Sequence, residues 1–155
     1  MAISRKACSV CKKSVEQTLM PLVSGEESSY HVSMKNVPIV QCPDGHKRLL
    51  HPDFAMRMMD SMAAGISAGK RRGFLWKRTT CGQCGSDIPP DQTRTKEYQV
   101  SLELIEVSEA TTAVLSAPVF RCAKCGMEQI AGENELMHVF KALARALKSA
   151  DIRAE

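Results

Sequence analysis

Two short motifs decide the fold: Cys81-Gly-Gln-Cys84-Gly and Cys122-Ala-Lys-Cys125-Gly. Each is a Cys-x-x-Cys-Gly turn, and a long span of largely β-forming residues separates them. The glycine after each pair permits a tight backbone turn that points both thiolates inward. Four thiolates that meet in this way match the tetrahedral coordination of Zn²⁺. The sequence therefore predicts a four-cysteine metal site at Cys81, Cys84, Cys122 and Cys125.

A second, less regular set lies in the first half of the chain. It consists of Cys8-Ser-Val-Cys11 and Cys42-Pro-Asp-Gly-His46. Gly45 stands where a fourth cysteine is expected, and the histidine follows one residue later. Because a histidine nitrogen reaches farther from the backbone than a cysteine sulfur, His46 can complete a Cys₃His site, which is a common structural zinc set. His51 is the next candidate for the fourth ligand, and His31 or a water is a further alternative.

Together the two predicted sites use all seven cysteines of the chain. We therefore expect two Zn²⁺ ions, although iron in a rubredoxin-like four-cysteine site is not excluded by the sequence. An odd number of cysteines does not suit a disulfide framework. The first residues contain no apolar run typical of a secretory signal, and no stretch approaches the roughly 18 apolar residues of a membrane span. These features predict a soluble, cytoplasmic protein with reduced or metal-bound thiols and no membrane contact.

The two halves of the chain repeat one pattern. Val37-Pro-Ile-Val-Gln-Cys42 aligns with Ala117-Pro-Val-Phe-Arg-Cys122. Apolar and polar residues alternate over residues 30–34 and again over residues 98–104, as expected for half-buried strands. Aromatic residues make up only 5% of the 155 residues, so a thin core stabilised by metal is expected. The predicted fold is a small α+β fold with two zinc-ribbon β-modules, each followed by an α-helix.

Both predicted helices have an apolar face. In the first, Phe54, Met58, Met62 and Ile66 recur every four residues, and Gly65 and Gly69 end the helix. The second spans about residues 132–150, with an apolar stripe at Leu136, Val139, Phe140, Leu143 and Leu147. We expect each ribbon to rest on its own helix, with exchange of helices between the halves as an alternative. This organisation gives a first domain at residues 1–68, a basic linker at 69–79 and a second domain at 80–155.

Charge is distributed unevenly along the chain. Residues 1–80 contain 13 Lys and Arg against 6 Asp and Glu, whereas residues 81–155 contain 8 against 11. The basic residues of the linker surround aromatic ones, a composition that can neutralise phosphates and stack on bases. The candidate nucleic-acid-binding residues are Lys70, Arg71, Arg72, Trp76, Lys77 and Arg78. For the uneven charge, composition alone favours solvated faces of differing sign over a polyanion-binding surface. For the linker, the alternative is a solvated segment whose apolar residues Phe74, Leu75 and Trp76 dock on the second domain.

The first half resembles the zinc-binding domain of MqsA-class antitoxins, also called the YgiT-type zinc finger. The resemblance covers roughly residues 6–66 and rests on Cys8-x-x-Cys11, the strand at 30–34, Asn36-Val-Pro38 and the Cys42 turn. It implies a structural zinc module that contacts a partner protein and is joined to a DNA-binding helix-turn-helix domain. Here a second ribbon stands where that domain is expected, and Gly45-His46 replaces the last cysteine. The resemblance therefore implies ligand roles for Cys8, Cys11 and Cys42, but not the antitoxin function.

Both predicted sites are coordinatively closed, whereas a catalytic zinc normally has three protein ligands and a water. The sequence contains no Gly-rich phosphate loop and no His-Glu-x-x-His motif. The leading hypothesis is thus a non-enzymatic zinc-binding adaptor or regulatory protein with a protein partner. The alternatives are a nucleic-acid-binding transcriptional regulator that uses the basic linker, and a thiol-redox or metal-dependent enzyme. The oligomeric state cannot be predicted from these patterns.

Overall fold

The computed structural model describes residues 7–73, 78–89 and 93–153. Within these residues, seven strands form one sheet in the order β10-β3-β2-β8-β7, with β1 also paired to β2 and β9 to β8. A second sheet has the order β4-β5-β6. The strands are β1 (Glu16–Glu27), β2 (Tyr30–Gln41), β3 (Lys47–Leu49), β4 (Lys70–Arg72), β5 (Arg78–Thr80), β6 (Asp87–Ile88), β7 (Thr93–Leu102), β8 (Thr111–Arg121), β9 (Glu128–Gln129) and β10 (Ile152–Arg153). The helices are α1 (Phe54–Ala64), the 3₁₀ turn η1 (Glu133–Glu135) and α2 (Leu136–Ser149).

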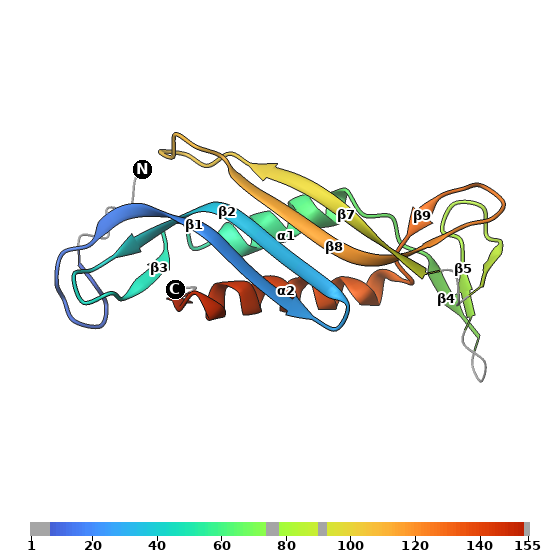
Figure 1. Cartoon of the computed structure of the whole chain (residues 1–155), viewed down its shortest axis with the longest axis horizontal. Coiled ribbons are helices and arrows are strands. Elements are labelled where there is room, and N and C mark those ends of the chain that lie inside the picture. The colour runs from blue at the N-terminus through green and yellow to red at the C-terminus, as the bar shows by residue number, and fades with distance from the viewer. Residues whose placement is uncertain (1–6, 74–77, 90–92, 154–155) are drawn as a thin grey trace.

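Two long antiparallel hairpins build the main sheet (Figure 1). One is β1–β2 and the other is β7–β8. The strands β2 and β8 pair with each other, from His31 opposite Ser116 to Lys35 opposite Thr112. The halves of the chain therefore share one continuous sheet. The predicted α+β class is confirmed, with mostly strands and two α-helices, while the division of the chain at residues 69–79 stays a prediction.

A local two-fold relation links the two halves at the centre of the sheet. Ser33 pairs with Val114, and Met34 pairs with Ala113. The sequence repeat makes Ser33 equivalent to Ala113 and Met34 equivalent to Val114. A rotation that exchanges the two halves of the chain therefore turns the Ser33–Val114 pair into the Met34–Ala113 pair. The local two-fold axis passes between these two pairs. As a result, equivalent parts of the two halves lie at opposite ends of the molecule.

The strand β2 continues through Asn36. Asn36 takes a left-handed conformation with φ of 59°, which asparagine tolerates better than most residues. The Thr111 hydroxyl donates a hydrogen bond to the Asn36 carbonyl at 2.8 Å. Along β2 the side chains buried in the main core change from Met34 to Val37 and Ile39 across this residue. The strand can thus keep its pairing with β1 while its inward-facing side changes phase.

The helix α2 packs closely on β1. Gly25 permits this approach, because a Cβ atom at that position would lie 2.3 Å from the Ala146 nitrogen. The Ser149 hydroxyl donates to the Ser24 carbonyl at 3.0 Å, and the Arg145 guanidinium donates to the Glu26 carbonyl at 3.2 Å. The C-terminal helix therefore covers the hairpin of the first half.

The helix α1 lies against β7 and α2, and Arg57 donates to the Glu103 carbonyl at 3.5 Å just beyond β7. The expectation that each ribbon rests on its own helix is thus wrong, and the alternative of helix exchange is correct. The reason is that both hairpins present their apolar sides on one shared face. A helix that leaves one end of the sheet then runs along that face into the other half (Figure 1).

One hydrophobic core joins both helices to the sheet. It includes Phe54, Met58 and Met62 of α1, together with Val139 and Leu143 of α2, all of which are buried. The predicted helical faces are confirmed at these positions. Three apolar side chains of the helices instead face solvent, since Met56 is 68% exposed, Met137 is 55% exposed and Phe140 is 51% exposed.

The segment predicted as a linker contains regular structure. The strands β4 and β5 pair from Lys70 opposite Thr80 to Arg72 opposite Arg78. This hairpin continues into β6 and so carries the Cys81 turn. Neither of the two α-helices in the described part of the chain has the length and apolar character needed to cross a membrane.

Candidate metal centres

Three of the four ligand-bearing turns share one backbone geometry. In the turn that begins at Cys81, the Cys81 N–H donates to the Ser86 carbonyl at 2.8 Å, and the Gly85 N–H donates to the Cys81 carbonyl at 3.0 Å. The turns that begin at Cys8 and Cys122 repeat both bonds. The fifth residue of each turn has a positive φ: 75° at Gly85, 76° at Gly126 and 65° at Lys12. The role predicted for the glycines is confirmed, and Lys12 adopts the same conformation without being glycine.

The turn that begins at Cys42 is one residue shorter. The Cys42 N–H donates to the His46 carbonyl at 3.1 Å, and the Gly45 N–H donates to the Cys42 carbonyl at 3.0 Å. By these bonds Gly45 corresponds to Gly126 and His46 to Met127. The residue equivalent to Cys125 is therefore missing. The histidine sits at the start of the outgoing chain, and its longer side chain reaches back toward the sulfurs.

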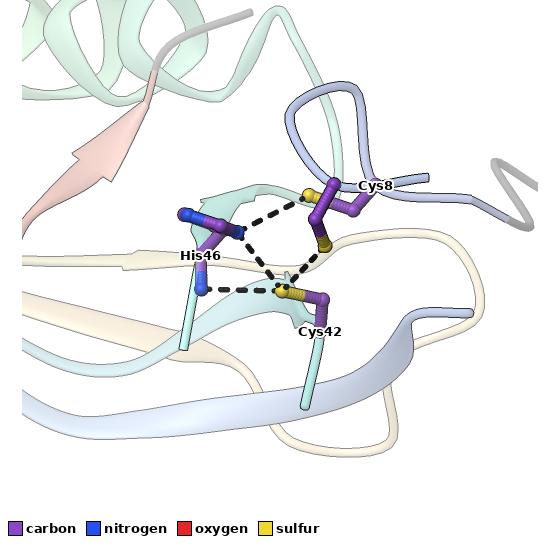
Figure 2. Close-up of side chains that lie close together, drawn as sticks. Cys8, Cys42 and His46 are labelled. Atoms are coloured by element: carbon purple, nitrogen blue, oxygen red, sulfur yellow. Dashed lines mark hydrogen bonds between the residues drawn. The ribbon is translucent and has the colours of Figure 1, made fainter. Parts of the chain in front are cut away.

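The first group has the dimensions of a metal tetrahedron. Figure 2 shows Cys8, Cys42 and His46 pointing toward one another. His46 Nδ1 lies 3.6 Å from Cys8 Sγ and 3.2 Å from Cys42 Sγ, while Cys11 Sγ lies 3.7 Å from Cys42 Sγ. Metal–ligand bonds typical of zinc give tetrahedral edges of about 3.8 Å between sulfurs and about 3.5 Å between sulfur and nitrogen. A disulfide would need about 2.05 Å. The four residues could therefore hold a metal ion.

The second group repeats this arrangement with four sulfurs. Cys81 Sγ lies 3.5 Å from Cys125 Sγ, and Cys84 Sγ lies 3.5 Å from Cys122 Sγ. In each group all four ligand atoms lie within 4.8 Å of one another. Cys81 and Cys122 are buried, whereas Cys84 and Cys125 are exposed. The structure thus brings together both predicted sets: Cys8, Cys11, Cys42 and His46, and Cys81, Cys84, Cys122 and Cys125.

The other histidines lie outside these groups. His51 Nε2 is 3.1 Å from the Ile105 carbonyl, and His31 is exposed on β2. His138 stacks on Tyr30 with a centroid distance of 5.5 Å. Its Nε2 lies 3.6 Å from a carboxylate oxygen of Glu135. Of the candidates considered for the fourth ligand of the first site, His46 is the one that the geometry supports.

The pKa values of two thiols in the first group are shifted in opposite directions. A hydrogen bond from the Cys11 backbone, opposed by burial, lowers the pKa of Cys8 to about 6. The Lys13 backbone lowers the pKa of Cys11, but burial and the neighbouring sulfurs of Cys42 and Cys8 outweigh it and raise that pKa to about 11. Like charges so close together cannot all form unaided. A divalent metal would remove this conflict, since it binds thiolates.

The second group has a buried polar neighbour, Gln129. Burial raises the pKa of Cys81, but a hydrogen bond from Gln129 and backbone donors in the turn outweigh it and lower the pKa to about 6. Gln129 Nε2 donates to Cys81 Sγ at 3.2 Å, and Gln129 Oε1 accepts from the Gly82 N–H at 2.8 Å. Contacts of this kind orient a ligand and tune the metal. Spacing motifs do not identify such a residue, because strand pairing brings it to the site.

The candidate nucleic-acid-binding residues are only partly described. Lys70, Arg71 and Arg72 are exposed on β4, and Arg78 is exposed on β5. Arg71 lies 3.4 Å from Glu135, and Arg78 lies 3.6 Å from Asp87. Trp76 and Lys77 lie outside the described residues. The described basic side chains therefore line one hairpin, with two of them paired to carboxylates.

No family model, curated protein or solved structure matches the chain. The resemblance of the first half to MqsA-class antitoxins therefore stays a prediction.

Proposed function

We propose that this protein is a non-enzymatic, two-zinc scaffold that acts as an adaptor for another protein. One observation carries the proposal: each group brings four protein ligand atoms within 4.8 Å of one another, close enough to surround one metal ion. A zinc ion bound there has no position left for water or substrate, which is typical of structural sites. The Cys₃His composition of the first group supports zinc, because this set is common among structural zinc sites.

The positions of the two groups support a structural role. They lie at opposite ends of the main sheet, near β3 at one end and near β5 and β9 at the other (Figure 1). The first group joins the turn before β1 to the end of β2, across 31 residues between Cys11 and Cys42. The second joins Cys84 to Cys122, 38 residues later in the chain. A metal that clips such loops reduces the entropy of the unfolded chain.

The exposed side chains on the helices support a protein partner. A groove of about 350 Å³ lies between α1 and α2. Its apolar lining residues are Ala55, Phe140, Leu143, Ala144, Leu147 and Ile152. Met56 and Met137 are also exposed on these two helices. Exposed apolar surface of this kind marks interaction sites, and methionine adapts to irregular partners.

Metal removal tests the structural role. Treatment of the purified protein with a strong chelator should lower its melting temperature and broaden the transition, because folding and metal binding are coupled in such sites. Circular dichroism melts with the free chelator, and with chelator already saturated with zinc as the control, measure this effect. Added zinc should restore the original transition. A metal-free protein that melts like the untreated one would contradict the structural role.

Nucleic-acid binding is a second candidate, favoured by the three consecutive exposed basic residues of β4. In that case affinity for a DNA or RNA duplex falls steeply with salt. The double variant Lys70→Ala/Arg72→Ala should then bind more weakly and flatten the slope of log affinity against log salt by about two. Lys124→Ala, at an exposed site in the Cys122 turn, is the matched control. Equal binding by wild type and both variants in gel shifts would reject this candidate.

A further inference from the structure

Arg48 and Gln129 occupy the same position in the two halves. In the first half Val40 of β2 pairs with Arg48 of β3, and in the second Phe120 of β8 pairs with Gln129 of β9. Val40 and Phe120 each stand two residues before the cysteine that ends their strand. The next residues, Leu49 and Ile130, are both buried in the core. The strand register therefore places Arg48 beside the first metal centre where Gln129 lies beside the second.

Gln129 contacts the first cysteine of its centre, Cys81, at 3.2 Å. The equivalent cysteine in the first centre is Cys8. Arg48 lines a small cavity of about 10 Å³ together with Cys8 and His46. That volume is about what one water molecule needs. Arg48 thus lines the same space as two of the four predicted ligands.

Arg48 is a buried cation without a compensating anion in the described part of the chain. It is only 9% exposed, and its Nε has no hydrogen-bond partner. Its Nη2 donates to the Ala7 carbonyl at 3.5 Å, a long bond. Within residues 7–73, 78–89 and 93–153 no carboxylate forms an ion pair with it. Lys47 and Arg153 line the same cavity, so the local charge is positive.

A metal-loaded first centre would supply the missing negative charge. Three thiolates, a neutral imidazole and a divalent ion carry a net charge of about −1. A buried guanidinium without an anion destabilises the fold, whereas one beside an anionic centre does not. The second centre would carry about −2, but Cys84 and Cys125 are exposed to water there. The neutral Gln129 therefore suffices at the second centre.

We propose that Arg48 is a positioning residue of the first metal centre: its unpaired Nε–H is available to donate to the Cys8 thiolate, and its charge balances that of the metal–thiolate group. This inference rests on the proposed metal binding. Its consequence is that Arg48 favours the metal-loaded form of the first site over the empty one. The two centres then differ in the residue that supports the metal ligands: the charged Arg48 at the first centre and the neutral Gln129 at the second.

The proposal predicts that loss of Arg48 weakens metal binding at the first site but does not lower the melting temperature of the metal-free protein. Arg48→Met should weaken metal binding at the first site by about tenfold to a hundredfold, the range seen when a residue that supports a metal ligand is lost. Binding at the second site should stay unchanged. The metal-free Arg48→Met variant should melt at the same temperature as the metal-free wild type or at a higher one, because the variant lacks a buried, unpaired charge. If Arg48 only filled space, both forms would melt at a lower temperature.

The experiment uses the full chain loaded with ¹¹³Cd. The two sites should give separate NMR resonances, because one has three sulfur ligands and the other has four. A competing chelator is titrated while the loss of each resonance is followed. Arg48→Gln gives the first centre the same side chain that Gln129 provides at the second. This variant should lose metal more readily than the wild type but less readily than Arg48→Met. Arg153→Met, which removes an exposed charge from the same cavity, is the matched control and should stay within about twofold of wild type.

Each outcome decides a different question. Wild-type chelator resistance at the first site in Arg48→Met, or an equal weakening in Arg153→Met, would overturn the role of Arg48 and leave metal binding intact. A wild-type chain that shows no first-site resonance at all would instead overturn the proposed function. If Arg48→Met does not fold, Arg48→Gln carries the test, and wild-type affinity in that variant would overturn the charge argument.

Discussion

Lys12 adopts a backbone conformation that glycine adopts in the other three ligand-bearing turns. Its φ is 65°, against 87° at Gly45, 75° at Gly85 and 76° at Gly126. A non-glycine residue in this region is strained by about 1 kcal/mol or more. The turn tolerates the strain because the two backbone hydrogen bonds found in the other turns also close this one. The Cys8 N–H donates to the Lys13 carbonyl, and the Lys12 N–H donates to the Cys8 carbonyl.

Lys12→Gly should therefore stabilise the metal-loaded protein. Relief of the strain outweighs the greater entropy of glycine in the unfolded chain, and we expect a gain of about 0.5–1 kcal/mol. Urea unfolding of the zinc-loaded protein measures the difference. Lys124→Gly is the matched control, since Lys124 is exposed in an equivalent turn and has no positive φ, and it should be neutral or destabilising. Equal losses of stability in the two variants would show that Lys12 is not strained.

Most metal ligands could be predicted residue by residue, but their neighbours could not. The spacing of Cys8, Cys11 and Cys42 predicts a site, and the reach of an imidazole makes His46 the first candidate for the fourth ligand, ahead of His51 and His31. Nothing in the spacing shows that His46 occupies the position of Met127, because that relation depends on which backbone groups bond across the turn. Gln129 was missed for a similar reason, since the pairing of β9 with β8 brings it to Cys81.

The contact between β1 and α2 depends on one glycine. A Cβ atom at Gly25 would lie 2.3 Å from the Ala146 nitrogen and 2.8 Å from the Ala142 carbonyl oxygen. Both neighbours are backbone atoms of a packed helix, so they cannot rotate away. A larger residue would have to push α2 from the sheet.

Gly25→Ala should consequently destabilise the protein by about 1–3 kcal/mol, as overpacking usually does. Gly65→Ala is the matched control, because the nearest atom to its added Cβ would be 3.7 Å away, an ordinary contact. Thermal melts of the two metal-loaded variants compare them directly. The close packing of α2 on β1 would be refuted by a Gly25→Ala protein as stable as the Gly65→Ala protein.

The elements themselves could largely be predicted, whereas their partners could not. The four-residue spacing of Phe54, Met58 and Met62 identifies the buried face of α1. Periodicity does not say which sheet covers that face. The exchange of helices follows from the pairing of β2 with β8, which joins two hairpins that are distant in the sequence into one surface. This long-range pairing has no local signal.

The described part of the molecule is built on one seven-stranded sheet, with the smaller β4-β5-β6 sheet beside it and a group of candidate metal ligands at each end (Figure 1). Both helices lie on the same core, so the two halves depend on each other for burial. Each metal would hold its own pair of turns, and the shared sheet would connect the two ends. Loss of either ion should therefore affect the entire fold rather than one half.

We propose that the two groups of ligand atoms hold two structural zinc ions. Elemental analysis of protein purified without added metal tests it most directly, together with variants that each disrupt one site. We expect about two zinc ions per chain in the wild type, and about one in both His46→Ala and Cys122→Ala. One zinc ion in the wild type, or iron in place of zinc, would contradict the account.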